Sequence, residues 1–584
     1  MTFRVALLPC ALAAILASNA FAADQAGEAK PQDDQPALTE FTYHTGLPRA
    51  PQQEAVVFEL ADLKFKVDPA NKHLDGDATL TFRATKPVDA LVVDLDRNFK
   101  VASVEVDGAA VTNWKNPEGR MTVPLAKPLA AGDSAKLRIV YDGKPHVAKR
   151  APWDGGFVWA TAPTGEPWIA SAIQGNGCDL FWPCIDHPQG EPLQVDQHVT
   201  VPAPLVSAGN GIAMGMDEKD GWRTYHWRTK NPDTYAISLN IGPYELLEGT
   251  YKSRYGNTFP MQFWHLKDRG AKAKELFAEF TPMLDFFEEV IGPYPFADEK
   301  MGVVETPHLG MEHQTINAYG NEYKKSEYGY DWLLQHEFAH EYFGNQLTNK
   351  DWDDMWLHEG LGTYMQPLYM QWLRGDMEYH ANLFKQRATL ANKHPVVSGK
   401  SMREEDVYSD ERGPGHDIYY KGSLVMDTLR HLVGDEAFFD ATRLAVYGRT
   451  DPKPGNFKPL YAGTKDYIAA VNKVTGKDYG WFFDVYLYQP ALPELVATRA
   501  NGQLNLEWKT GGKPFPMPVD VRVGNKVETV AMTGGRGSLP IAADQSFTLD
   551  PHSKVLRQLA HIDAFQKDRD EREKEEARKK AAGG

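Results

Sequence analysis

The stretch His336-Glu337-Phe338-Ala339-His340, followed after eighteen intervening residues by Glu359, decides how the central part of this chain must fold. In a helix, residues four positions apart lie on the same face, so His336 and His340 can bind one metal ion. Glu359, within Trp356-Leu357-His358-Glu359-Gly360, can supply a carboxylate ligand from a second helix. Two imidazoles and one carboxylate leave the fourth position of a tetrahedral zinc ion open for water, as in catalytic zinc sites. The pattern predicts one catalytic Zn²⁺ per chain, with Glu337 placed to handle a proton on the water.

A pair of satisfied core histidines on an apolar helix is the alternative, because Phe338, Ala339 and Phe343 lie close by in the sequence. The H-E-x-x-H pattern alone also occurs by chance in unrelated proteins. A glutamate at this distance, inside its own apolar and aromatic segment, favours the metal site over that alternative.

Length and composition describe an ordinary globular protein of several domains. The 584 residues are too many for one domain, and 42% hydrophobic with 24% charged residues is a globular composition. The formal net charge of −16 argues against a nucleic-acid partner. Composition does not indicate an oligomeric state.

The first residues have the features of a secretory signal peptide. Arg4 gives a positive start, residues 5–16 form an apolar core, and Ala20-Phe21-Ala22 is a small-x-small cleavage site. We expect a signal peptide over residues 1–22 and a flexible leader over residues 23–45, with a buried N-terminal helix as the alternative. No later apolar run is long enough to cross a bilayer. These features predict an exported protein, periplasmic or secreted, without membrane insertion.

Two cysteines remain once the signal peptide is removed, Cys178 and Cys184. In an oxidising compartment they can form a disulfide across a short loop. Two buried thiols are an equal alternative, because the segment between them is rich in apolar residues.

The period of the apolar residues divides the chain into regions. Leu63, Phe65 and Val67 alternate with lysines, which predicts a β-rich domain over residues 46–245. From residue 246 the apolar spacing becomes helical, and a mainly helical catalytic domain is expected over residues 246–490. Alternation returns in residues 491–556, which predicts a small β-sandwich. Residues 557–584 are dense in opposite charges and predict a solvated helical tail, with an interaction role as the alternative. The expected fold is multidomain α+β.

A further motif, Gly310-Met311-Glu312-His313, precedes the predicted zinc ligands in the sequence and is similar to a motif of a known family. It resembles peptidase family M1, the aminopeptidase N-type gluzincins, whose G-x-M-E-N motif binds the free α-ammonium group of a substrate through its glutamate. The resemblance implies that Glu312 binds that group, with Gly310 and Met311 lining the site. His313 replaces the usual asparagine, and Leu309 the leading glycine. A surface glutamate is the alternative for Glu312.

Two other segments are similar to motifs of the same family. Tyr419, in Tyr419-Tyr420-Lys421-Gly422, fits the Y-x-K-G pattern whose tyrosine donates to the oxyanion, and Tyr420 is its rival one position away. Gln174 precedes Cys178 in a segment similar to the family's Q-x-x-x-C…F-x-P-C-x-D-x-P signature. A family glutamine there helps to hold the N-terminal end of the substrate. A structural role in a loop is the alternative for Gln174.

Together these resemblances imply a saddle-like N-terminal β domain and a thermolysin-like catalytic domain. They imply a zinc aminopeptidase that releases single amino acids from peptides with free N-termini. His336, His340 and Glu359 would bind zinc, Glu337 would activate water, and Tyr419 with zinc would stabilise the oxyanion. A zinc endopeptidase, or a bifunctional aminopeptidase and epoxide hydrolase, is the alternative. The side chain preferred at the cleaved position is not predicted.

Overall fold

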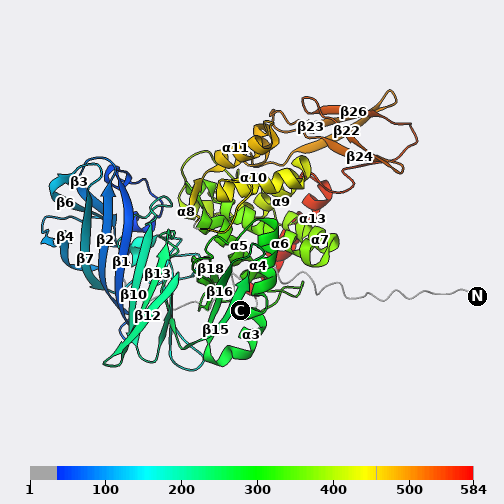
Figure 1. Ribbon diagram of the computed structural model, residues 1–584. Coiled ribbons are helices and arrows are strands. Elements are labelled where there is room, and N and C mark those ends of the chain that lie inside the picture. The colour runs from blue at the N-terminus through cyan, green and yellow to red at the C-terminus, as the bar shows by residue number, and fades with distance from the viewer. Residues whose placement is uncertain (1–35, 456, 583–584) are drawn as a thin grey trace, which may run out of the picture.

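The computed structural model describes residues 36–455 and 457–582 (Figure 1). The predicted signal peptide and most of the predicted leader lie outside the described residues. A β-rich region (blue to cyan), a mainly helical region (green to yellow) and a small β region (orange) follow one another along the chain. This order confirms the predicted multidomain α+β fold.

An eight-stranded sheet, in the order β12-β13-β10-β1-β2-β7-β4-β5, dominates the N-terminal domain. In β1, Leu63, Phe65 and Val67 are buried while the intervening lysines are exposed, as the alternation predicts. The strands of this sheet are β1 (Val56–Asp68), β2 (His73–Ala84), β4 (Lys100–Val106), β5 (Ala109–Ala110), β7 (Ser134–Gly143), β10 (Gln194–Pro202), β12 (Ile212–Lys219) and β13 (Trp222–Lys230).

Smaller elements complete the N-terminal domain. A four-stranded sheet has the order β11-β14-β9-β8, and β3 pairs with β6. These elements are α1 (Glu40–Tyr43), α2 (Pro51–Glu54), β3 (Val88–Asp94), β6 (Arg120–Leu129), β8 (Gly156–Thr161), β9 (Pro167–Ala172), β11 (Val206–Ala208) and β14 (Asn240–Gly242). The loop after β9 carries Gln174, and beyond it a disulfide joins Cys178 to Cys184. Of the two alternatives left open by the sequence, the structure therefore has the disulfide.

The catalytic region begins with a mixed five-stranded sheet, which the helical spacing in the sequence does not predict. Its order is β15-β16-β17-β19-β18, and its strands are β15 (Tyr244–Lys252), β16 (Thr258–Leu266), β17 (Met301–Glu305), β18 (Gly310–Met311) and β19 (Asn317–Tyr319). All five residues of β17 are buried, so they show no alternation. A short, fully buried strand has no period-2 signal, which is why the apolar pattern missed it.

Helices form the rest of the catalytic region. They are α3 (Gly270–Phe277), α4 (Phe280–Val290), α5 (Trp332–His340), α6 (Trp356–Arg374), α7 (Asp376–Arg387), α8 (Glu404–Val407), α9 (Asp417–Val433), α10 (Asp435–Tyr447), α11 (Thr464–Thr475) and α12 (Gly480–Tyr486). The short strands β20 (Leu347–Asn349) and β21 (Leu460–Ala462) pair in parallel between them. One large hydrophobic cluster joins these helices to the five-stranded sheet.

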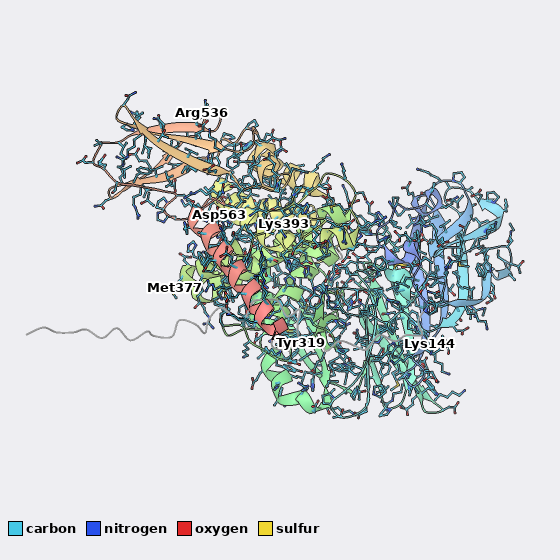
Figure 2. The ribbon with its side chains drawn as sticks, turned by 180° about the vertical axis from the view of Figure 1, so that it is seen from behind. Lys144, Tyr319, Met377, Lys393, Arg536 and Asp563 are labelled. Atoms are coloured by element: carbon cyan, nitrogen blue, oxygen red, sulfur yellow. A yellow bond between two sulfur atoms is a disulfide. The ribbon has the colours of Figure 1, made fainter. Side chains whose placement is uncertain are left out.

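Two three-stranded sheets form the C-terminal β region, in the orders β22-β23-β26 and β25-β24-β27. Their strands are β22 (Glu494–Ala500), β23 (Gln503–Lys509), β24 (Val519–Val523), β25 (Lys526–Val530), β26 (Arg536–Pro540) and β27 (Phe547–Leu549). The chain then returns as helix α13 (Ala560–Ala582), which lies across the helical region in Figure 2. Gln566 and Arg569 of α13 donate to the carbonyl of Ala388. Among the described residues, no helix combines the length and apolarity needed to cross a bilayer.

Glycines allow α6 and α9 to pack closely at the centre of the catalytic region. A Cβ atom on Gly422 would lie 2.8 Å from the Cα of Gly360, and one on Gly360 would lie 3.0 Å from the Cα of Gly422. The obstacle in both cases is backbone, which cannot rotate away. This contact sets the distance between Glu359, beside Gly360, and Tyr419, one turn before Gly422.

We therefore expect Gly422→Ala to force α6 and α9 apart and to lower the free energy of unfolding by about 1–3 kcal/mol. Urea unfolding followed by circular dichroism measures this change. Gly270→Ala is the matched control, because its Cβ would meet only His265 Cε1 at 3.8 Å and its φ of −51° suits alanine. Equal stability of the Gly422→Ala variant and the parent would show that the helix contact is not tight.

Candidate metal centre

Helix α5 and the turn after it fix the orientation of His340. Asp331 caps the start of α5, where its carboxylate accepts from the backbone NH of Leu334. After His340 the backbone leaves the helical conformation at Phe343 and at Gly344, whose φ of +154° favours glycine. The carbonyl of Phe343 thereby comes within 2.9 Å of His340 Nδ1. A proton on Nδ1 leaves the lone pair of Nε2 free to bind a metal.

Three potential ligand atoms converge on one point. His336 Nε2 lies 3.1 Å from His340 Nε2, and Glu359 Oε2 lies 3.5 Å and 3.4 Å from these two nitrogens. Glu359 comes from the first turn of α6, so two helices supply the set. Ligands about 2.0–2.1 Å from a tetrahedral zinc ion are separated by about 3.3 Å, close to these distances.

The chemistry of this set fits zinc. Glu359 Oε2 is buried and has no hydrogen-bond partner among the described residues, although Oε1 accepts from Tyr408 at 2.9 Å. A buried carboxylate oxygen without a partner is costly, and a bound cation would satisfy it. Two imidazoles and one carboxylate are the donors of a catalytic zinc site with one open position. His336, His340 and Glu359 would hold the ion.

The electrostatics around the set favour a cation. Burial opposes protonation of His340, but the carboxylates of Glu312 and Glu359 overcome it and raise the pKa of His340 to about 10. Burial raises the pKa of Glu337 well above its usual range, against the opposing charge of His340. Atoms of Glu312, Glu337 and His340 all lie within 4.8 Å of one another. A carboxyl group of raised pKa beside a water site can both accept and return a proton.

Glu312 is held by residues of the N-terminal domain. Its Oε1 accepts from Gln174 Nε2 at 2.9 Å and from the hydroxyl of Tyr235 at 2.8 Å. Its backbone carbonyl accepts from Asn345 Nδ2 at 3.0 Å, in the turn that follows α5. The structure thus brings Gln174 and Glu312, both identified in the sequence, into direct contact. Tyr235 was missed, because no motif surrounds it in the sequence.

The two residues before Glu312 have different surroundings. A Cβ atom on Gly310 would lie 2.5 Å from Glu337 Oε1, so the backbone of β18 passes directly beside that carboxylate. Met311 is 4% exposed and packs into the hydrophobic cluster of the N-terminal domain. The structure therefore brings Gly310 beside Glu337 and uses Met311 to join the two domains.

Of the two adjacent tyrosines in α9, Tyr419 faces the cluster. Its ring centroid lies 6.3 Å from that of His336. Burial, with Glu359 and Glu312, raises the pKa of Tyr419 well above its usual range, whereas burial alone raises that of Tyr420. Tyr419 therefore remains a protonated donor at neutral pH. Tyr408, which no sequence motif identifies, also belongs to the site. Its hydroxyl donates to Glu359, and its ring centroid lies 6.3 Å from that of Tyr419.

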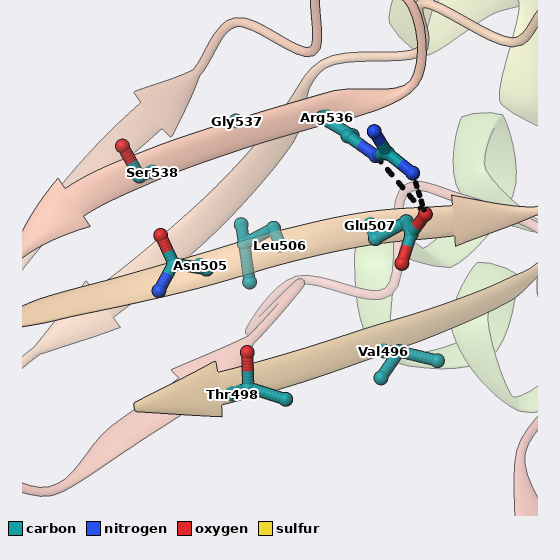
Figure 3. A pocket seen from close by; sticks show the side chains of 8 residues that line it. All are labelled: Val496, Thr498, Asn505, Leu506, Glu507, Arg536, Gly537 and Ser538. Carbon is teal, nitrogen blue, oxygen red and sulfur yellow. Dashed lines mark hydrogen bonds and ion pairs between the residues drawn. The ribbon is translucent and has the colours of Figure 1, made fainter. Parts of the chain in front are cut away.

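A separate hollow of about 400 Å³ lies on the β22-β23-β26 sheet (Figure 3). Asn505 and Glu507 line it, on the face opposite to the buried Leu504 and Trp508. The carboxylate of Glu507 is already paired with Arg536 and Lys509. This hollow therefore offers no free acid or base for chemistry.

Comparison with known families fits this geometry. The Peptidase family M1 domain matches residues 283–486, and the Peptidase M1 N-terminal domain matches residues 57–235. The chain belongs to peptidase family M1. The predicted membership of this family is thereby confirmed, and the family is one of zinc metallopeptidases.

Individual relatives cover different shares of this M1 chain. Leukotriene A-4 hydrolase of Xenopus laevis is 23% identical over 76% of this chain and 74% of that protein. Aminopeptidase N of Lactococcus lactis subsp. cremoris is 30% identical over 183 residues, which are 30% of this chain and 20% of that protein. A solved structure of an M1 zinc metallopeptidase from Deinococcus radiodurans, in which a mutant is bound to a Tyr-Ser-Ala substrate, has a similar fold. Its TM-score is 0.63 at 25% sequence identity, and the match covers 77% of this chain and 98% of that one.

The converging ligand atoms predict that the parent retains about one zinc ion per chain and that His340→Ala loses most of it. Removal of one of three protein ligands leaves too few donors to hold the ion. Metal content after dialysis, measured by inductively coupled plasma mass spectrometry, tests this. His73→Ala is the matched control, since His73 is paired with Asp75 in the N-terminal domain. Full zinc retention by His340→Ala would contradict the assignment of the ligands.

Proposed function

We propose that this M1 chain is a zinc aminopeptidase that hydrolyses the first peptide bond of peptides and releases single amino acids. The contact of Glu312 with Gln174 and Tyr235, beside the zinc ligand set and Glu337, carries this proposal. A buried carboxylate next to the reaction centre favours a substrate that ends there in an ammonium group. It disfavours an internal peptide bond, which has no positive charge to offer.

The residues of the chain divide the chemistry among them. Zinc, when bound, supplies a Lewis acid that lowers the pKa of water and polarises the scissile carbonyl. Glu337 accepts the proton of the attacking water and returns it to the leaving amine, for which its raised pKa suits it. Tyr419 donates a hydrogen bond to the oxygen on which negative charge develops. Glu312 binds the α-ammonium group and so sets cleavage after the first residue.

The comparisons support this proposal in general terms. Aminopeptidase N is among the relatives, and the neighbouring M1 metallopeptidase was captured with a tripeptide substrate. An endopeptidase is disfavoured by the position of Glu312. The similarity to leukotriene A-4 hydrolase keeps the bifunctional alternative, with an additional epoxide-hydrolase activity, as a second candidate.

We also propose that the protein acts after export, in the periplasm or outside the cell. The signal-peptide pattern of residues 1–22 is the basis for this, and the disulfide between Cys178 and Cys184 supports it. Stable disulfides form in oxidising compartments.

The proposed chemistry predicts that Glu337→Gln lowers kcat on aminoacyl-anilides by about a hundred- to ten-thousandfold while zinc stays bound, because the amide cannot accept a proton. A chelator should abolish the activity of the parent. Initial rates on a panel of aminoacyl-anilides, with metal content measured in parallel, test both statements. Glu275→Gln, an exposed change in α3, is the control and should match the parent. Activity that survives both Glu337→Gln and the chelator would overturn the mechanism.

A further inference from the structure

The segment that precedes β1 crosses between the two domains beside the metal site. Residues 39–46, which we call the N-terminal strap, include α1. On one side the strap is bonded to the N-terminal domain. The carbonyl of Tyr43 accepts from Asn176 Nδ2 at 2.7 Å. Thr45 Oγ1 donates to Asp186 Oδ1 at 3.0 Å. The strap is therefore attached to the N-terminal domain at two neighbouring points.

His44, between these two points, contacts the catalytic region instead. Its Nδ1 lies 3.0 Å from Glu405 Oε2, and its Nε2 lies 2.8 Å from Arg403 Nη1. Nε2 is also 2.9 Å from Oε1 of Glu40, one turn earlier in the strap. Arg403 directly precedes α8 and Glu405 lies in it, on the side of the helical region that faces the N-terminal domain (Figure 1). His44 is 6% exposed, so a buried ring joins the strap to α8.

A second contact joins the strap to the catalytic region at Gly46. The φ of Gly46 is +72°, and a Cβ there would lie 2.1 Å from Trp352 Nε1, so the backbone passes directly against the indole. Trp352 begins the short helix η4 (Trp352–Asp354), which lies just before α6. Because α6 supplies Glu359 from its first turn, the strap contacts segments on two sides of this zinc-ligand candidate.

Helix α8 bears on the metal site through Tyr408, the residue that follows it. The Tyr408 hydroxyl donates to Glu359 Oε1 at 2.9 Å. Glu359 Oε2 lies 3.5 Å and 3.4 Å from Nε2 of His336 and His340. One carboxylate oxygen is thus held by Tyr408, and the other is left for the metal. The backbone NH of Tyr408 bonds to the carbonyl of Glu404 at 3.2 Å, so a shift of α8 would carry Tyr408 with it. Hydrogen bonds of this kind orient a metal ligand.

We propose that the N-terminal strap holds Tyr408 against the zinc ligand Glu359, with His44 as the positioning residue. His44 acts through α8 and Tyr408. This inference rests on the zinc site of the proposed function and extends that site to a contact between domains. The domain that holds Glu312 thereby also orients a metal ligand, and retention of zinc depends on the strap.

The test measures how fast the zinc-loaded, full-length protein releases zinc to an excess of a colorimetric chelator. Tyr408→Phe should release zinc about ten- to hundredfold faster than the parent, because Glu359 loses its hydrogen bond. His44→Ala should release zinc about threefold faster or more. In the Tyr408→Phe background, His44→Ala should add less than about twofold, because the hydroxyl through which the strap acts is already absent.

Three further variants complete the comparison. His44→Asn keeps a polar group near the place of Nδ1 and should regain part of the slow release. Glu405→Ala removes the same contact from the side of α8, where the side chain is 25% exposed, and should also release zinc faster. It serves in place of His44→Ala if that variant does not fold. His73→Ala is the matched control, since His73 is paired with Asp75 in the N-terminal domain, and should stay within about twofold of the parent.

Release of zinc at the parent's rate by His44→Ala and Glu405→Ala would overturn this inference. Equal acceleration by His44→Ala with and without the Tyr408 hydroxyl would overturn it too, since the effect would then be a general loosening of the fold. The measurement uses no substrate, so a failure of the aminopeptidase proposal on aminoacyl-anilides is distinguishable from a failure of the strap. A parent that binds no zinc would overturn both proposals.

Discussion

Three buried carboxyl groups around the buried imidazole of His340, with the half-buried His336 beside it, form the constraint on which the rest of this structure depends. Glu312, Glu337 and Glu359 lie within reach of His340, which is itself buried. Holding these buried carboxyl groups in their ionised form is unfavourable unless a cation lies beside them. Zinc is the cation that this donor set suits, so the same groups that make the site costly without a metal make it a strong metal site.

The site belongs to two domains. The helical region supplies the ligand set, Glu337 and Tyr419, whereas Gln174 and Tyr235 reach Glu312 from the β-rich N-terminal domain. Met311, next to Glu312, is buried in the hydrophobic cluster of that domain. The N-terminal domain therefore does more than cover the catalytic one, because it fixes the carboxylate proposed to bind the substrate's amine.

A site residue could be predicted from the sequence only where it lies in a local sequence motif. His336, His340 and Glu359 have one, because helical spacing brings the two histidines together whatever the rest of the fold. Tyr235 and Tyr408 have none, and they join the site only through contacts between segments far apart in the chain. Strand β17 of the five-stranded sheet was missed for a related reason, since a strand that is buried throughout lacks the alternation that identifies strands. The positions of these residues and of this strand depend on packing between distant segments, which a periodic pattern in the sequence does not report.

The most direct test of the whole account is the order in which a peptide is shortened. Incubation of the purified protein with a ten-residue peptide, free or acetylated at its N-terminus, can be followed by time-resolved mass spectrometry. We expect the free peptide to lose one residue after another from its N-terminal end and the acetylated peptide to persist, because only the free amine can pair with Glu312. Cleavage at internal bonds, or equal rates for the two peptides, would contradict the account.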